Sequence, residues 1–255
     1  MYSLIGKRSL RKLSEYSAIG FDVDHCLVKF SVPEFIELTY KALARVLVEE
    51  KGYPKSLLEY GKKEQSYLHN GLVLDLEKGI ALKLGKDKLI LRAYQDFDNI
   101  SLKDIHSLYG NPPIFSKFDP YHAYGKDYVC SLTYFELAFP LFFAKLVDIT
   151  KEKHKRPLTK EDVNQILLDS YYAIDANYSH FDDNEYKSIN SFGYSYTHLI
   201  QNKEKMVLKN DRVLSILKSL KLKGKTLFLL TNSHYEHLQA VMDQAFGKEW
   251  IDLFD

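Results

Sequence analysis

Two short apolar runs stand out along the chain, at Ala18–Phe21 and Thr226–Leu230. Small or acidic polar residues follow each run, which is typical of strands buried in a parallel sheet. Before the second run, apolar residues at helical spacing predict a helix over Asp211–Leu222, with Gly224 as a natural stop. The order strand, helix, strand indicates an α/β fold with a doubly wound, Rossmann-like sheet.

A long segment of different character separates the two runs. Phe35–Lys51 has the spacing of an amphipathic helix. Residues 71–94 alternate between apolar and polar positions, with breaks at two glycines, which predicts a small antiparallel β-meander. Further helices are expected over Tyr134–Lys151 and Thr159–Tyr178, the second opened by a variant capping box that ends at Asp162.

This order of elements predicts a discontinuous core with an inserted domain. We expect the core over residues 1–34 and 210–255, and a large, mostly helical cap with the β-meander over residues 35–209. An insertion explains the pattern better than two sequential domains, because the two strand-like runs stand at opposite ends of the chain. A sheet cut short after the second run would expose a strand edge, so association into a homo-oligomer is an open possibility.

Composition narrows the functional classes. Apolar content of 45%, charged content of 27% and aromatic content of 14% are those of a folded globular protein. Lys plus Arg, 35 residues, nearly balance Asp plus Glu, 34 residues, which disfavours nucleic acid polymers and membranes as partners. Two distant cysteines, Cys26 and Cys130, suit free thiols in a reducing compartment.

The N-terminal residues leave two localisations open. Lys7, Arg8, Arg11 and Lys12 precede the first acidic residue, Glu15, as in a mitochondrial transit peptide. A solvated leader explains the same residues, and no apolar signal-peptide core is present at this end. We therefore expect a cytoplasmic protein, with a mitochondrial location as the alternative.

Asp22 and Asp24 are the strongest candidates for chemistry. They follow the first apolar run directly, and ligands of open α/β sheets gather at the carboxyl ends of the strands. An Asp-x-Asp pair is often only a turn or a helix cap, but charged residues beside a buried strand are rare without a partner or a metal. Paired carboxylates suit Mg²⁺, and an Asp can also attack phosphorus directly.

Polar residues also follow the second run, at Thr231-Asn232-Ser233. Their hydroxyl and amide groups can bind a phosphoryl oxygen at a helix N-terminus, although the same residue types are ordinary helix caps. His234 and His237 lie close behind them. Two histidines without a third ligand indicate surface or capping residues rather than a metal site.

These two segments resemble a known pattern. Phe21-Asp22-Val23-Asp24-His25-Cys26-Leu27-Val28 is similar to the first motif of the haloacid dehalogenase superfamily, and Leu229-Leu230-Thr231-Asn232-Ser233 to its second. The stretch from Gly71 to Tyr94 resembles a cap segment of the cytosolic purine 5′-nucleotidase family within that superfamily. The resemblance extends over nearly the whole chain, from residue 18 onward.

The resemblance implies a Mg²⁺-dependent hydrolase of nucleoside 5′-monophosphates that works through an aspartyl-phosphate. Asp22 matches the family's nucleophile and a metal ligand. Asp24 matches its acid/base and also contributes to the metal site. Thr231, Asn232 and Ser233 match the phosphate-binding segment, and Asp175 in the cap matches an acidic residue that holds the base. The family's neighbouring arginine falls on Tyr171.

Two departures from the family pattern limit this inference. Cys26 replaces a hydroxyl-bearing or β-branched residue, which is expected to weaken the turn. The family's downstream lysine and further acidic residues have no counterpart, because Lys248 comes too early. Without them the carboxylates would repel a phosphate. The alternatives are therefore a catalytically silent nucleotide-binding or protein-interaction module, and a phosphatase for another small phosphomonoester.

Overall fold

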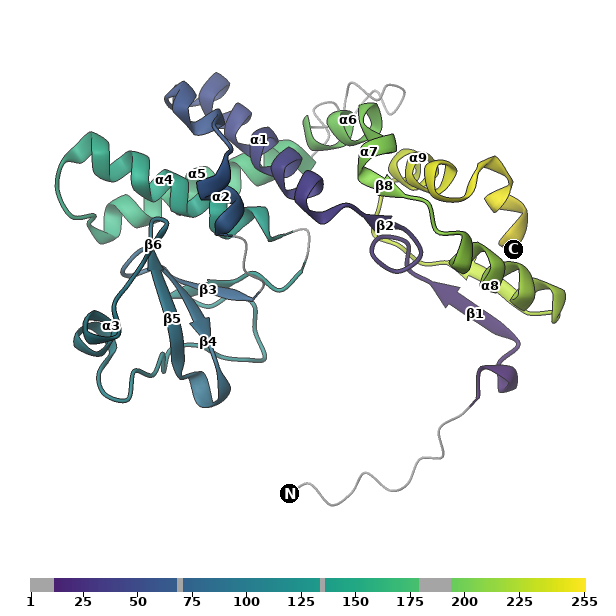
Figure 1. Cartoon of the computed structure of the whole chain (residues 1–255), viewed down its shortest axis with the longest axis horizontal. Helices are drawn as coiled ribbons and strands as arrows, with labels where there is room; N and C mark the ends of the chain where they lie inside the picture. The colour runs from purple at the N-terminus through teal and green to yellow at the C-terminus, as the bar shows by residue number, and fades with distance from the viewer. Residues whose placement is uncertain (1–11, 68–70, 134–135, 179–193) are drawn as a thin grey trace, which may run out of the picture. The chain divides into compact units, whose positions relative to one another are not determined.

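The computed structural model describes residues 12–67, 71–133, 136–178 and 194–255 (Figure 1). The chain divides into two compact units. Unit 1 comprises Met1–Ser31 and Ile200–Asp255, and unit 2 comprises the intervening Val32–Leu199. Most of the basic leader, at residues 7, 8 and 11, lies outside the described residues. That the two units are a haloacid dehalogenase-like core and its cap stays a prediction.

Unit 1 contains two small sheets and the helices around them. Strand β1 pairs in parallel with β9, with Ala18 opposite Thr226 and Phe21 opposite Leu229. Strand β2 pairs with β8 in antiparallel fashion. The elements of this unit are the short 3₁₀ helix η1 (Leu13–Glu15), β1 (Ala18–Phe21), β2 (Lys29–Phe30), α7 (Lys203–Met206), β8 (Val207–Leu208), α8 (Asp211–Leu222), β9 (Thr226–Leu229), α9 (Tyr235–Phe246) and the 3₁₀ helix η6 (Lys248–Leu253).

The expectation that the first strand is buried is wrong. Residues of β1 alternate between exposed and half-buried positions. On β9 the side chain of Leu227 is fully buried, whereas Phe228 is 40% exposed. The ring of Phe228 fills the space above Gly20, where an added Cβ would lie 2.5 Å from its Cε2 atom. Ala18, Gly20 and Phe228 are all exposed, so the face of the sheet on which they lie is open to solvent.

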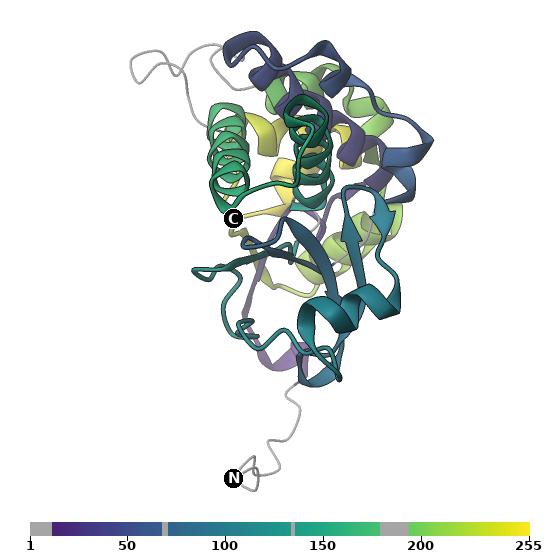
Figure 2. The ribbon, with the colours of Figure 1, turned by 90° about the vertical axis from the view of Figure 1, so that its left-hand side faces the viewer.

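Unit 2 is built on a five-stranded antiparallel sheet with strand order β6-β5-β4-β3-β7. Helices α1, α4 and α5 lie together along one side of this sheet (Figure 2). The elements are α1 (Val32–Glu50), η2 (Lys55–Leu58), α2 (Lys62–Ser66), β3 (Leu72–Asp75), β4 (Ile80–Leu84), η3 (Lys86–Lys88), β5 (Ile90–Gln95), β6 (Asp98–Asn99), α3 (Leu102–Tyr109), β7 (Tyr128–Cys130), α4 (Ala138–His154), α5 (Lys160–Tyr178) and most of α6 (Tyr194–Gln201).

Strand β3 of the unit 2 sheet is buried on both of its faces. Leu72 and Leu74 of β3 pack in the same cluster as Phe142 of α4. Val73, between them, points the other way and packs with Ile105 of α3. Successive strand residues point to opposite faces, so the burial of all four β3 residues shows that this strand is covered on both sides.

The predicted elements agree with the structure in most places. A mixed α/β architecture is confirmed, as are the β-meander and the helix over Asp211–Leu222. The capping box before α5 is present, because the Asp162 carboxylate accepts the Thr159 N–H at 2.7 Å and the Thr159 hydroxyl accepts the Asp162 N–H at 3.3 Å. Helix α4 begins at Ala138, and residues 134 and 135 lie outside the described part. No described helix is long and apolar enough to cross a membrane.

Candidate active site

The parallel pairing of β1 and β9 brings the two sequence motifs to one end of their sheet. The Leu230 N–H donates to the Phe21 carbonyl at 2.9 Å, so the ladder continues past both strands. Asp22 directly follows β1, and Thr231 lies two residues beyond the end of β9. Neighbouring parallel strands end at the same edge, which is where ligands of α/β sheets bind.

A tight loop after β1 orients the acidic residues. The Val23 carbonyl accepts the N–H groups of Cys26, Leu27 and Val28 at 3.2, 2.9 and 2.9 Å. His25 takes a left-handed conformation with φ of 57° to allow this turn. The turn is thus closed by main-chain hydrogen bonds, and Cys26 is an exposed free cysteine beside it.

Asp24 is the centre of a buried polar cluster. Its Oδ2 accepts the hydroxyl proton of Ser233 at 2.5 Å, and its Oδ1 lies 3.2 Å from Nε2 of His237. The Asp24 side chain is 10% exposed and that of His237 is 5% exposed. An ionised carboxylate can only accept hydrogen bonds, so Nε2 of His237 carries the proton in this contact. Ser233, in the loop after β9, and His237 of α9 therefore fix the orientation of a residue that follows β1.

The surroundings of Asp24 favour its charged form. Burial of the carboxyl group acts to raise its pKa, but the hydrogen bond and charge of His237 and the hydrogen bond from Ser233 act against burial and prevail. The pKa of Asp24 is consequently lowered from its ordinary value. The nearby His25 has its pKa lowered by burial, although the negative charge of Asp24 opposes that change.

His237 was expected at the surface or as a helix cap, and this expectation is wrong. Its ring stacks on Phe30 at 6.5 Å between centroids, and Phe30 is itself 1% exposed. The sequence did contain a signal for this position. Val241 lies four residues after His237 on the same buried face of α9, so helical periodicity places the histidine inside.

The remaining predicted residues at this end of the sheet are more open. Asp22 and Asn232 are exposed, and Oδ1 of Asp22 accepts the N–H of Val23 at 2.8 Å. Thr231 is half-buried, and its hydroxyl oxygen accepts the Ser233 N–H at 3.1 Å. That contact leaves the hydroxyl proton of Thr231 available to a ligand. Ser233, by contrast, already donates to Asp24.

Asp175 lies in the other unit. It is exposed on α5, directly after Ile174, which lines a largely apolar cavity of about 560 Å³. Tyr171, one turn earlier, lines the same cavity and stacks on Phe139 with centroids 6.0 Å apart. Asp175 is not among the residues that line it. The structure therefore brings Asp22, Asp24 and the Thr231–Ser233 segment together in unit 1, whereas Asp175 belongs to unit 2.

The oxygen donors at the end of β1 suit a hard cation only in part. Asp22 is an exposed residue, whereas both oxygens of the Asp24 carboxylate are engaged by protein donors. Within the described ranges there is no group of three His, Cys, Asp or Glu side chains placed to hold a metal ion. Mg²⁺ prefers oxygen ligands and retains several waters in proteins, so its binding at Asp22 and Asp24 stays a prediction.

Known proteins similar to this chain carry related names. It is 30% identical over 251 residues to human 5′-nucleotidase domain-containing protein 1, covering 95% of this chain and 52% of that protein. The bovine protein of the same name gives 30% identity over 249 residues, with the same coverage. Rat 5′-nucleotidase domain-containing protein 2 is 24% identical over 245 residues, covering 95% of this chain and 41% of that protein.

The chain thus spans about half the length of the curated relatives it matches. The family model that matches is described as the 5′ nucleotidase family, and its match extends over residues 7–255. This agrees with the resemblance drawn from the Asp22 and Thr231 motifs, while placement in the haloacid dehalogenase superfamily stays a prediction. Because the match covers nearly the entire sequence, the chain belongs to the 5′ nucleotidase family.

Proposed function

We propose that this chain carries the phosphoryl-transfer residues of a phosphohydrolase that acts on nucleoside 5′-monophosphates. One observation supports the proposal most strongly. The parallel pairing of β1 and β9 places Asp22 and Asp24 at the same sheet edge as Thr231 and Ser233. A nucleophile, a proton-transfer group and hydroxyl donors for phosphate are the parts that hydrolysis through an aspartyl-phosphate needs.

In the proposed reaction, the exposed carboxylate of Asp22 attacks phosphorus and the ester oxygen leaves. Asp24 gives a proton to that oxygen, then takes one from the water that cleaves the aspartyl-phosphate. Asp24 is a carboxylate at neutral pH, because its pKa is lowered. A phosphate dianion beside it would raise that pKa, since like charges disfavour ionisation. Substrate binding therefore helps to put the required proton on Asp24.

Thr231 is the better placed of the two hydroxyls to hold the phosphate, because its proton is not used by Asp24. A bound Mg²⁺ would neutralise phosphate charge. Asp22 and the main-chain carbonyl of Asp24 are the oxygen donors proposed for it. The roles of Asn232 as a further phosphate contact and of Asp175 as a contact to the base remain proposals, as does a cytoplasmic location.

A second candidate is a catalytically silent module that binds nucleotide or protein without turnover. The observation in its favour is that Ser233 and His237 occupy both oxygens of Asp24. A carboxylate held in this way is a poor general acid as long as its pKa stays low. The two candidates share the same residues and differ in whether Asp24 becomes protonated when a phosphate is bound.

Phosphate release from purified chain with Mg²⁺ distinguishes these candidates. The panel would contain purine and pyrimidine nucleoside 5′-monophosphates together with sugar phosphates. The proposal predicts release from nucleotides that is abolished in Asp22→Asn and retained in Asp252→Asn, a matched change at an exposed aspartate of the same unit. Equal activity in Asp22→Asn refutes the nucleophile. Nucleotide binding without release favours the silent module, and release from sugar phosphates alone favours another phosphatase.

A further inference from the structure

A basic cavity of about 490 Å³ lies in unit 2, among residues that the proposed hydrolysis does not use. It is formed where the β3–β4 turn and the end of β5 meet the loop between α4 and α5. Four of its lining side chains are cationic, and we name them together the basic cleft: Lys78, Lys151, Lys155 and Arg156.

The backbone around the basic cleft is held in place by packing and hydrogen bonds. The Lys78 N–H donates to Oδ1 of Asp75 at 3.3 Å, and the hydroxyl of Tyr109 donates to Oδ2 of the same carboxylate at 2.8 Å. A Cβ on Gly79, next to Lys78, would lie 3.2 Å from Cγ2 of Val163 on α5. The β3–β4 turn therefore packs directly against α5, and this packing fixes the position of the Lys78 backbone.

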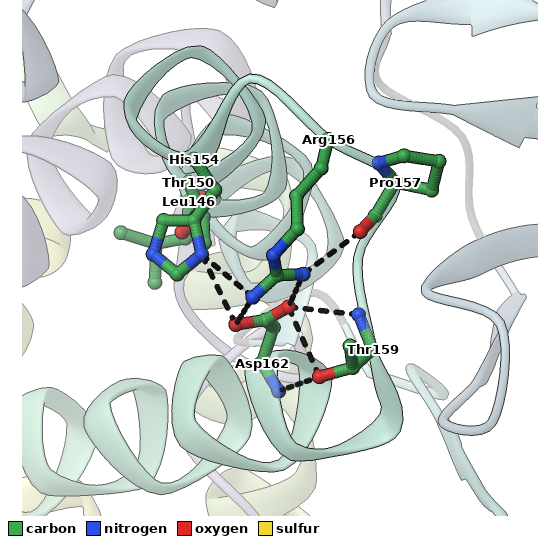
Figure 3. A network of polar contacts seen from close by, with 7 residues as sticks. All are labelled: Leu146, Thr150, His154, Arg156, Pro157, Thr159 and Asp162. Atoms are coloured by element: carbon green, nitrogen blue, oxygen red, sulfur yellow. Dashed lines mark hydrogen bonds and ion pairs between the residues drawn. The ribbon is translucent and has the colours of Figure 1, made fainter.

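Arg156 forms a fixed wall of the basic cleft. Its terminal nitrogens donate to both oxygens of Asp162, at 2.6 and 3.2 Å, and to the carbonyl of Pro157 at 2.8 Å. Figure 3 shows these contacts together with Nδ1 of His154, 2.9 Å from one of the same nitrogens. The guanidinium is thereby oriented by its neighbours, and its Nε–H is not used by these contacts.

The lysines of the basic cleft carry positive charge that nearby acids balance only in part. Lys151 pairs with Asp96 at 2.8 Å. Lys78 lies 3.9 Å from Glu77, but that carboxylate is in closer contact with Lys117. Among the described residues, no carboxylate lies within ion-pairing distance of Lys155. Like charges gathered around a concave surface repel one another, and a bound anion relieves that repulsion.

We propose that the basic cleft binds a small anion that carries two or more phosphate groups, such as pyrophosphate. Lys78 and Lys155 supply ammonium donors, and Lys151 and Arg156 supply positive charge held in position by Asp96 and Asp162. Lysine is a common phosphate ligand because it presents several donors on a flexible stem. This site is separate from the Asp22 motif and does not depend on the proposed hydrolysis.

A small anion fits the surroundings better than a nucleic acid or an anionic membrane. The chain as a whole has a formal net charge of only +1. Glu77, Asp96 and Asp162 lie beside the four cations and would repel an extended polyanion that runs past the cavity. A compact ligand that enters the cavity can meet the cations while its charge stays localised.

Isothermal titration of the 255-residue chain with pyrophosphate, without divalent metal and at constant ionic strength, tests the proposal. We expect saturable binding that is weakened at least tenfold in the double variant Lys78→Ala/Lys155→Ala. The matched control Lys103→Ala/Lys126→Ala removes two exposed lysines elsewhere in unit 2 and should bind as the unchanged chain does. Circular dichroism of both variants establishes that they are folded, and Lys78→Gln/Lys155→Gln repeats the test with longer neutral side chains.

Several results would overturn the proposal. One is that the unchanged chain does not bind pyrophosphate. Another is that the cleft variant and the control variant lose pyrophosphate affinity to the same extent. A third is that the chain binds single-stranded RNA or phosphatidylserine vesicles, that this binding is weaker in the cleft variant, and that pyrophosphate does not compete with it. In that case the same lysines would serve a macromolecular partner, and the small-anion assignment would be wrong.

Discussion

The contact between His237 and Asp24 leads to a quantitative prediction about unit 1. Replacing His237 with Ala removes a 3.2 Å contact to a largely buried carboxylate and the ring that stacks on Phe30. A hydrogen bond to a charged group contributes about 1.5–3 kcal/mol. The deleted ring also leaves a cavity, so we expect His237→Ala to lower the free energy of unfolding of unit 1 by about 2–4 kcal/mol.

The single tryptophan of the chain makes this measurable. Trp250 lies on η6 in unit 1, is 4% exposed, and donates from Nε1 to Asp243 at 2.8 Å. Its fluorescence during urea unfolding therefore reports on unit 1, whereas circular dichroism reports on both units. Gln239→Ala, at an exposed position of the same helix, is the control and should change stability by less than about 0.5 kcal/mol.

A double-mutant cycle isolates the part of this effect that passes through Asp24. In an Asp24→Ala background the His237→Ala change should cost about 1.5–3 kcal/mol less than in the unchanged chain, because the carboxylate is already absent. An equal cost in both backgrounds would show that His237 stabilises unit 1 by packing on Phe30 alone. The inference that His237 orients Asp24 would then be wrong.

Other parts of the structure give three further predictions. Glu64→Gln should destabilise unit 2 by about 3–5 kcal/mol in urea denaturation followed by circular dichroism. It breaks a 3.0 Å ion pair in which the side chains of Glu64 and Lys145 are 6% and 12% exposed. The hydrogen bond from Arg156 lowers the folded-state pKa of Asp162 below its ordinary 3.8. The resulting stabilisation is therefore present above the unfolded-state pKa and lost as pH falls through the folded-state pKa, a dependence that thermal melts of Asp162→Asn should lack. Leu230 is 74% exposed at the open sheet, so Leu230→Glu should reduce any self-association seen by sedimentation velocity, and unchanged association would place the interface elsewhere.

Local sequence patterns predicted the elements well where neighbours in the chain determine them. The helix over Asp211–Leu222 has its expected bounds, and Asn210 caps it through its side chain. The Thr159 capping box formed as expected for the same reason, because its hydrogen bonds join residues three positions apart. Such interactions are encoded within a few residues and need no knowledge of the fold.

The features that the sequence did not predict depend on contacts between distant segments. The burial of His237 arises from Asp24 and Phe30, which lie more than two hundred positions earlier in the chain. The exposure of β1 depends on what packs against its sheet, and an apolar run such as Ala18–Phe21 carries no information about that packing. Periodicity predicts that a strand forms, but the covering of its faces depends on the rest of the fold.

The two candidate functions make different demands on the bond between Ser233 and Asp24. In the structure this serine donates to Asp24, so it cannot give the same proton to a phosphate. A bound phosphate dianion raises the pKa of Asp24, and a protonated Asp24 no longer needs the serine proton. The serine hydroxyl then becomes available to the phosphate in the same step that prepares Asp24 as an acid. Catalysis therefore requires Ser233 to exchange its hydrogen bond to Asp24 for one to the phosphate when the nucleotide binds, whereas a silent module would keep the bond to Asp24. An infrared band of protonated Asp24 that appears with bound nucleotide, and is absent in Asp24→Asn, would separate the hydrolase from the module.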